Sequence, residues 1–490
     1  MAFLLACSII GFGYVKSGFF PPSNTPLFFI DLWMPEGTDI RETYKRVQRI
    51  EKQLLEKEQI EFVSSSTGRG LQRFTLTYAP EKTFSAYAQI QVRTLSRKEM
   101  LPFMEQLREE LRNQYPDSLF KFHFMALGPS PSSKIEARVI GSDPNILRHI
   151  AAQVEDIFNA DPGSQNVTHN WRQHNKVLTP VFNESQARRL AISKEDLSTT
   201  LQMNFGGIQV GMFRDKTQML PIIIRSTREE RHQYDSIENI KIWSPALQST
   251  VPIQQVIEKT EIQWHDPIIH RRDRKRTLTV QADHDIFGTD TAAGLLSRVK
   301  EKVEAIPLPP GYIIEWGGEY EASQYATEAV IKPLPLGYLV MFVITVLLFN
   351  SFRQTLVLWI TVPLAIVGVT FGLLITQLPF SFTALLGLLS LSGMVLKNGI
   401  VLLDQTRSEL ETGATPYEAI VKSTISRVRP VTMAALTTML GMLPLLFDNF
   451  FNSMAVTIIF GLGFATLLTL GVIPIVYAIC YKIKAPKPES

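Results

Sequence analysis

The 490-residue chain carries 49 lysines and arginines against 46 aspartates and glutamates, and this near balance gives a formal net charge of +3. So small an excess of positive charge gives no support for a nucleic-acid-binding protein, and two cysteines near opposite ends give no disulfide framework. The sequence contains no Walker loop, zinc-protease helix, nucleophile elbow or dinucleotide-binding fingerprint. We therefore predict no enzyme, no catalytic residue, no cofactor and no metal site.

The first apolar segment, residues 2–14, is too short to span a bilayer, because a transmembrane helix needs about 20 residues. The segment also lacks the basic start and the small-residue cleavage site of a signal peptide. We interpret residues 1–15 as the truncated end of a longer transmembrane helix.

Residues 16–130 alternate between strand and helix patterns and form the first predicted soluble domain. Leu27–Pro35 has the apolar pattern of a strand, and Asp39 is placed to cap the helix that follows. The apolar stripe of that helix consists of Ile40, Tyr44, Val47, Ile50 and Leu54. Further strands are predicted at 60–65, 73–77, 86–93 and 120–125, and a further helix at 96–115.

A similar pattern recurs in residues 131–178 and 263–325, which we predict to be two parts of a second soluble domain. Asp143 and Pro144 are suited to start its first helix. Its strands are predicted at 134–141, near 167, at 274–283 and at 311–316, and its second helix at 291–306. Such βαβ units build ferredoxin-like layers. Residues 179–262 form an insertion, with helices at 183–190 and 194–204 and strands at 209–213 and 220–225.

The carboxy-terminal part of the chain is a series of apolar runs. Transmembrane helices are predicted at 326–350, 355–375, 380–404, 430–448 and 453–482, with an amphipathic linker at 405–429 and a tail at 483–490. Basic residues lie only in alternate connections, which are therefore predicted to be cytoplasmic. Residues 18–329 then lie on the outer side, in the periplasm of a bacterium. The predicted fold class is an α+β membrane protein.

Lys397 lies inside the third of these helices, where a charge costs a few kcal/mol. One interpretation is that its long side chain snorkels to the cytoplasmic surface. The other is a role in an ion relay with a carboxylate. Asp404 is about 10 Å away along the helix axis, too far for a direct pair, and the other spans have no acidic residue in their interiors. A neutralising carboxylate is therefore expected from outside this chain.

Three stretches together carry a family resemblance: "PPSNTPLFFIDLWMPEGT" (21–38), "GMVLKNGIVLLDQ" (393–405) and "TPYEAIVKSTISRVRPVTMAALTTMLGMLPLLF" (415–447). With them the chain resembles, over nearly its whole length, the carboxy-terminal half of a resistance-nodulation-division efflux permease of the hydrophobe/amphiphile type. The resemblance implies two periplasmic porter subdomains, a docking or funnel domain at 179–262, and a transmembrane helical bundle.

The resemblance also implies a proton relay, in which two aspartates of the other half pair with Lys397. The relay residues that it indicates here are Lys397, Asn398, Asp404, Arg427 and Thr432. The family's relay threonine falls on Ala434, so Thr437 and Thr438 are alternatives to Thr432.

The drug-transporting members of this family carry a switch loop between substrate pockets, and "SSSTGRG" (64–70) occupies its place here. That loop usually has phenylalanines where this chain has serines. The predicted pocket and switch residues are Phe62, Ser64, Ser66, Arg69, Phe74 and Phe84. The phenylalanines are equally well explained as core residues.

The function implied by the resemblance is proton-driven export of drugs or other amphiphilic compounds from the bacterial inner membrane and periplasm, which confers multidrug resistance. The expected partners are an amino-terminal half, a periplasmic adaptor and an outer-membrane channel, with the whole pump a homotrimer. Three alternatives stay open: a lipid- or protein-exporting relative, a membrane-anchored sensor or assembly factor without transport activity, and a truncated, non-functional product.

Overall fold

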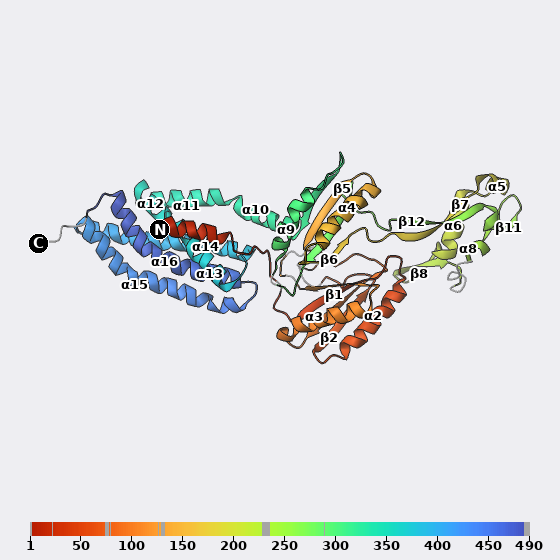
Figure 1. Ribbon diagram of the computed structural model, residues 1–490, viewed down its shortest axis with the longest axis horizontal. Helices are drawn as coiled ribbons and strands as arrows, with labels where there is room; N and C mark the ends of the chain where they lie inside the picture. The colour runs from red at the N-terminus through yellow and green to blue at the C-terminus, as the bar shows by residue number, and fades with distance from the viewer. Residues whose placement is uncertain are drawn as a thin grey trace. The chain divides into compact units, whose positions relative to one another are not determined.

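The computed structural model describes residues 2–21, 23–73, 78, 80–125, 127–128, 133–227, 236–288 and 290–484. The chain divides into two compact units (Figure 1). One comprises residues 1–172 and 268–490, and the other comprises residues 173–267. Each unit is described below by itself.

The first sheet of the larger unit has the antiparallel strand order β2-β3-β1-β4. Its strands are β1 (Leu27–Trp33), β2 (Ile60–Thr67), β3 (Tyr87–Thr94) and β4 (Leu119–Phe124). Helices α2 (Ile40–Leu55) and α3 (Arg97–Gln114) cover one face, where they pack on Phe28, Ile30 and Leu32 of β1 (Figure 1). Side chains alternate along a strand, so the next residues of β1 face the other side of the sheet.

Helix α2 starts as predicted, because the backbone N–H of Arg41 donates to the Asp39 carboxylate at 2.7 Å. Its predicted apolar stripe is partly wrong, since Ile40 and Tyr44 are 45% and 52% exposed. Thr43 is buried in their place, and its hydroxyl donates to the Ser85 carbonyl at 2.8 Å. A polar residue can enter the core when its hydrogen bond is satisfied in this way.

The second sheet contains β5 (Ile135–Gly141), β6 (Ser164–His169), β13 (Arg271–Arg272), β14 (Lys275–His284) and β15 (Ile313–Gly318). The strand order is β13-β14-β5-β15, and β6 also pairs with β14. Helices α4 (Pro144–Asn159) and α9 (Ala292–Glu304) pack against Val139 and Val280 of this sheet. Asp143 caps α4 as predicted. Buried Trp171 donates to the Thr277 carbonyl at 2.9 Å and fixes the chain after β6.

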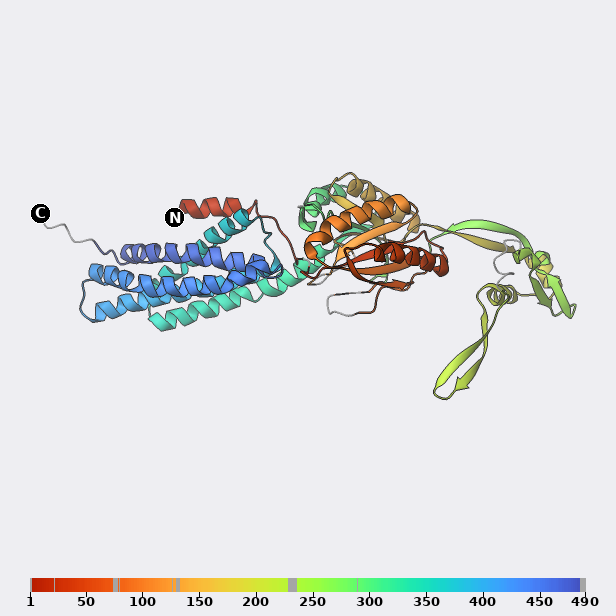
Figure 2. The same cartoon turned by 90° about the horizontal axis from the view of Figure 1, so that it is seen from below.

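The smaller unit begins and ends with the paired strands β7 (Asn175–Phe182) and β12 (Ile257–His265). Its core contains Ala187, Ile242 and Ile253. The other elements are α5 (Glu184–Arg189), α6 (Lys194–Phe205), β8 (Ile208–Asp215), β9 (Gln218–Ile224), α8 (Ser236–Asn239), β10 (Lys241–Ser244), β11 (Ser249–Pro252) and the 3-10 turn η1 (Ile253–Gln255). The β8–β9 hairpin projects from the rest of this unit (Figure 2).

The described residues include five helical spans that are long and apolar enough to cross a membrane, as predicted. They consist of α10 (Glu319–Ile331) with α11 (Leu334–Phe349), α12 (Phe352–Trp359) with η2 (Val362–Leu364) and α13 (Ala365–Thr376), α14 (Phe382–Glu411), α15 (Pro416–Met442) with η3 (Leu443–Phe447), and α16 (Asn452–Cys480). Residues 405–429, predicted as a linker, are helical except at 412–415. The short α1 (Ala2–Phe12) packs on α13, with the Ser8 hydroxyl donating to Thr370 Oγ1 at 3.0 Å.

The spans differ sharply in how much of their surface the chain itself covers. The apolar windows of α12–α13 and of α16 are each 56% buried, whereas that of α10–α11 is 6% buried and that of α15 is 11% buried. Bare apolar helices are suited to lipid or to further helices. Two of the five spans therefore expose apolar surface that the rest of this chain does not cover.

Candidate functional site

Lys397 lies on the exposed face of α14, one turn beyond the exposed Gly393. A Cβ atom added to Gly393 would meet nothing within 4 Å, so this face of the helix is open. No ion pair between described residues involves Lys397, although it sits within an apolar span. A carboxylate partner for Lys397 from outside this chain stays a prediction.

The structure does not gather the other predicted relay residues around Lys397. Asn398 is buried on another face of α14, and its Nδ2 donates to Thr466 Oγ1 of α16 at 3.5 Å. Thr432 donates to the Val428 carbonyl of its own helix at 2.6 Å. Thr437 and Thr438 likewise donate to carbonyls of α15. The described residues thus contain no hydrogen-bonded path from Lys397 to a threonine of α15.

Arg427 is placed at the end of α14 that carries Asp404. Its Nη2 donates to Gln405 Oε1, and its buried Nε has no hydrogen-bond partner among the described residues. Asp404 itself is exposed, and no ion pair between described residues involves it. Arg427 therefore contacts α14 one residue beyond Asp404, and Asp404 is about 10 Å from Lys397 along the helix axis.

The predicted switch residues lie on and beside an edge strand. Phe62, Ser64 and Ser66 are on β2, opposite Arg93, Gln91 and Gln89 of β3, and Arg69 is exposed after the strand. Phe84 packs on the ring of Trp33, with 5.4 Å between centroids. Phe74 lies outside the described residues. Apart from Phe74, these residues are spread along one sheet edge and do not converge on one point.

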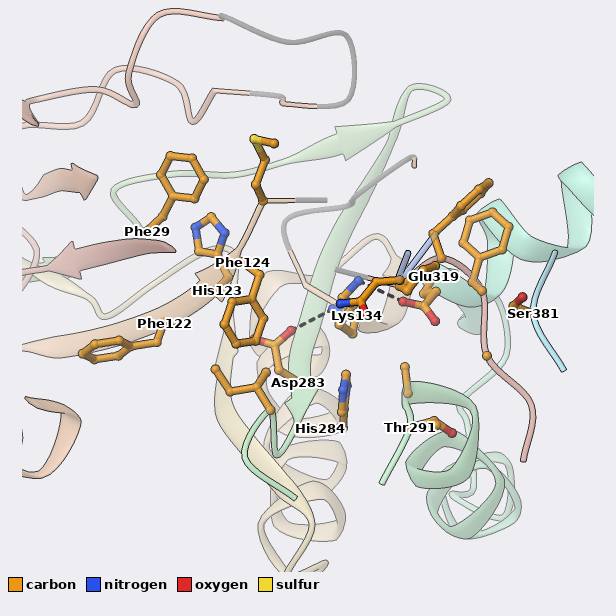
Figure 3. Close-up of a pocket in the computed structure, with 18 of the residues that line it drawn as sticks. Phe29, Phe122, His123, Phe124, Lys134, Asp283, His284, Thr291, Glu319 and Ser381 are labelled. Carbon is orange, nitrogen blue, oxygen red and sulfur yellow. Dashed lines mark hydrogen bonds and ion pairs between the residues drawn. The ribbon is translucent and has the colours of Figure 1, made fainter. Parts of the chain in front are cut away.

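The sequence reasoning missed one cavity of the larger unit. It has a volume of about 450 Å³ and lies between the open faces of the two sheets and the ends of the membrane helices (Figure 3). Its lining includes Phe19, Phe20, Phe29, Asp31, Tyr78, Glu81, Gln89, Lys121, Phe122, His123, Phe124, Lys134, Asp283, His284, Glu319, Leu378, Ser381 and Asn452. It combines aromatic walls with a set of convergent charges, as ligand sites commonly do.

Asp31 is the centre of one polar cluster in this cavity. Its carboxylate accepts from Tyr87 at 2.7 Å and from Gln89 Nε2 at 2.8 Å, and His123 Nε2 lies 3.1 Å away. Burial alone would raise the pKa of Asp31, but His123 and the hydrogen bonds outweigh it and lower the pKa. Burial, and then the charge of Asp31, raise the pKa of Tyr78 to about 12. Asp31 is thus an anion beside neutral tyrosines.

A second cluster joins the two sheets. Asp283 Oδ2 of β14 lies 2.9 Å from Lys121 Nζ of β4, and its Oδ1 accepts from the backbone N–H of Lys134 at 2.9 Å. Lys134 Nζ lies 3.0 Å from Glu319 Oε2 at the start of α10, as Figure 3 shows. Burial would raise the pKa of Asp283, but Lys121 and these hydrogen bonds lower it. Asp283 therefore stays ionised, and the cluster links both sheets to the first membrane span.

A sequence signal for this cavity was present in the strands. Phe29 and Asp31 alternate with core residues in β1, and Lys121 and His123 do so in β4. Charged residues at alternate positions of a strand whose other side chains are buried indicate a second face with its own function. Only the pairing of β1 with β4 shows that Phe29 lies opposite His123 and that Asp31 lies opposite Lys121.

The comparisons with known proteins agree with one another. The family model described as the AcrB/AcrD/AcrF family matches residues 1–481. Over 353 residues the chain is 28% identical to the nickel-cobalt-cadmium resistance protein NccA of Alcaligenes xylosoxydans xylosoxydans, covering 70% of this chain and 32% of NccA. Over 364 residues it is 27% identical to the cobalt-zinc-cadmium resistance protein CzcA of Cupriavidus metallidurans, covering 71% of this chain and 34% of CzcA.

Among solved structures, the crystal structure of a heavy metal efflux pump superposes with a TM-score of 0.82 at 20% identity. The match covers 98% of this chain and 49% of that chain. At this identity the likeness shows the fold. The chain thus spans about a third of the length of the curated relatives that it matches and about half of the solved pump.

Proposed function

This chain belongs to the AcrB/AcrD/AcrF family, which places it in the bacterial inner membrane, and we propose that it is the carboxy-terminal half of a proton-driven efflux permease. The observation that carries the proposal is the exposed Lys397 on an apolar span, which has no ion-pair partner among the described residues, in a chain that matches this family over residues 1–481. The sheet order β2-β3-β1-β4, with both helices on one face, supports the ferredoxin-like arrangement of its first soluble subdomain.

The proposed coupling step is a change of charge at the carboxylates that pair with Lys397. When carboxylates of an amino-terminal half are ionised, they neutralise Lys397 and hold the helices together. Protonation of those carboxylates removes the attraction, and the helices can then shift. Two ion pairs, Glu319–Lys134 and Asp283–Lys121, are joined by the hydrogen bond from the Lys134 backbone N–H to Asp283, and they would carry this shift to the two soluble sheets.

Divalent metal cations are our first candidate for the cargo. The named relatives are resistance proteins for nickel, cobalt, zinc and cadmium, and this favours cations over the drugs that the sequence alone led us to expect. The anion Asp31 gives the cavity one site of attraction for them. In the described part of the chain no group of three or more His, Cys, Asp or Glu is placed to hold a metal ion. Further ligands would have to come from elsewhere in the pump.

Amphiphilic compounds are the second candidate, because the cavity has an aromatic wall. Phe19, Phe20, Phe29, Phe122 and Phe124 all line it. A periplasmic adaptor, an outer-membrane channel and assembly as a homotrimer belong to this proposal as well. A lipid- or protein-exporting role, a sensor role and an inactive product are the alternatives that an export assay rejects.

The test is Lys397→Ala in cells that lack related pumps and express this chain with a matching amino-terminal half. We expect the variant to lose resistance to cobalt, zinc and cadmium, and efflux of an amphiphilic dye if that is the cargo, while its amount in the membrane stays unchanged. Lys422→Ala, which removes an exposed lysine near the cytoplasmic end of α15, is the matched control. Normal export by Lys397→Ala would leave snorkelling as the explanation for this residue.

A further inference from the structure

The hairpin that joins β13 to β14 carries an unusual concentration of positive charge. Its two-residue turn places Asp273 at φ +50° and Arg274 at φ +66°, in the left-handed region. The register sets Arg271 opposite Arg276 and Arg272 opposite Lys275. Like charges directly opposite one another destabilise a strand pair. The fold therefore holds four cations together at a cost in stability.

Only part of this charge is neutralised within the chain. Arg272 Nη2 lies 2.7 Å from Glu321 Oε1. Arg276 donates one N–H to the Ser142 carbonyl, and its Nε is buried without a hydrogen-bond partner among the described residues. Arg271, Arg274 and Lys275 are exposed, and no carboxylate of the described residues lies within 4.0 Å of them. Three cations and one buried donor thus remain for a ligand.

These groups surround a hollow of about 550 Å³, which we call the basic pocket. It is lined by Ile140, Gly141, Ser142, Arg271, Arg274, Lys275, Arg276, Gly311 and Ile313. None of these residues is acidic. Ile313 is exposed on β15, which lies at the edge of the sheet and among the described strands pairs with β5 alone. The basic pocket thus offers cations beside an apolar residue and a free strand edge.

We propose that the basic pocket binds a carboxylate-rich peptide segment of a protein partner. The planar fork of arginine matches a carboxylate in a bidentate manner. An extended segment can place several carboxylates along the hairpin and an apolar side chain against Ile313. A pocket larger than one small anion, bounded by a strand edge, favours such a segment over a free phosphate. This rests on the proposed function only in that a periplasmic adaptor would be the natural partner.

The test uses the full chain in detergent and a fluorescein-labelled peptide of glutamate and isoleucine, followed by fluorescence anisotropy. We expect saturable binding that weakens with salt, and no binding of the analogue with glutamine in place of glutamate. Combined Arg271→Glu, Arg274→Glu and Lys275→Glu should weaken binding at least about tenfold. The matched control, Arg41→Glu with Arg49→Glu and Lys52→Glu, makes the same charge change on exposed residues of α2 and should bind normally.

Three outcomes would overturn the proposal. The first is equal binding by the pocket variant and the α2 control. The second is complete displacement of the peptide by inorganic phosphate at equal concentration, which would make the pocket a small-anion site. The third is loss of binding once a matching amino-terminal half is present, which would mean that this half covers the pocket. Lys397→Ala should bind the peptide normally, so a failure of the proposed export function is distinguishable from a failure of this proposal.

Discussion

Lys121 Nζ on β4 lies 2.9 Å from Asp283 Oδ2 on β14, so an ion pair joins the two soluble sheets of the larger unit. The two side chains are 13% and 9% exposed. Asp283 also accepts from the backbone N–H of Lys134, whose ammonium group pairs with Glu319. A buried pair with satisfied hydrogen bonds fixes geometry more than it adds stability, and breaking it is costly.

Asp283→Ala should therefore lower the free energy of unfolding of the soluble sheets by about 3 kcal/mol, because the buried Lys121 loses the carboxylate that lies 2.9 Å away. Urea denaturation followed by tryptophan fluorescence in detergent measures the change. Glu42→Ala is the control, because its pair with Lys45 is exposed and should contribute less than about 1 kcal/mol. Equal effects of the two substitutions would show that the pair does not join the sheets.

Acidification should destabilise the same region through His284. Burial, and then the charge of Lys134, lower the pKa of His284 below its ordinary 6.5. The unfolded chain binds this proton more readily, so stability falls as the pH falls through 6.5 toward the folded pKa. Asp31 and Asp283 have lowered pKa values, and their contributions are lost only as the pH falls below 3.8.

Urea denaturation at about pH 7.5 and about pH 5.5 checks this dependence. His284→Gln should reduce the loss of stability between the two values. Glu81 acts in the opposite sense, since burial and then Asp31 raise its pKa above 4.5 and the folded protein takes up this proton first. Glu81→Gln should therefore leave the loss of stability between the two pH values unchanged or make it larger. If His284→Gln loses as much stability between the two pH values as the unchanged protein, His284 is not the group responsible.

Gly318 controls the position of Glu319. It has φ +71°, and a Cβ atom there would lie 2.6 Å from the Lys134 carbonyl oxygen. Gly318→Ala should cost about 1–3 kcal/mol and displace Glu319 from Lys134. Gly311→Ala separates the strain of a positive φ from the steric clash with a neighbouring atom, because Gly311 has φ +86° but open space around its Cβ position. A larger loss of thermal stability for Gly311→Ala than for Gly318→Ala would contradict the steric account.

Gly393 tests whether the open face of α14 receives an amino-terminal half. Gly393→Leu should leave insertion and stability of this chain unchanged, since a Cβ atom there meets nothing within 4 Å. It should prevent co-purification with the other half. Gly461→Leu is the contrasting variant, because its Cβ would lie 2.3 Å from Leu391 and should disrupt this chain itself. Normal co-purification of Gly393→Leu would place the contact elsewhere.

Sequence reasoning worked where local chemistry decides the structure. Asp39, Ser96, Asp143 and Thr291 cap the helices that were predicted to start there, because each offers a side-chain oxygen to a free backbone N–H. The five apolar spans were found because a bilayer sets a minimum length. Ile40 and Tyr44 were misplaced because helix periodicity does not show which neighbouring face meets the sheet.

The candidate cavity could not be predicted in the same way. Its charges come from strands far apart in the chain, and only the pairing of β1 with β4 and the approach of β14 bring Asp31, Lys121 and Asp283 together. The role of Lys397 in an ion relay was predicted instead from the energetic cost of a charge inside a membrane span. That cost can be estimated without knowing which residues lie near Lys397.

The most direct measurement of the central claim is proton-driven flux of zinc or cobalt in liposomes that contain this chain alone, both halves together, or both halves with Lys397→Ala. The account predicts that an imposed pH gradient drives flux only with both halves and that Lys397→Ala abolishes it. Flux of comparable rate from this chain alone, or undiminished flux with Lys397→Ala, would contradict the account.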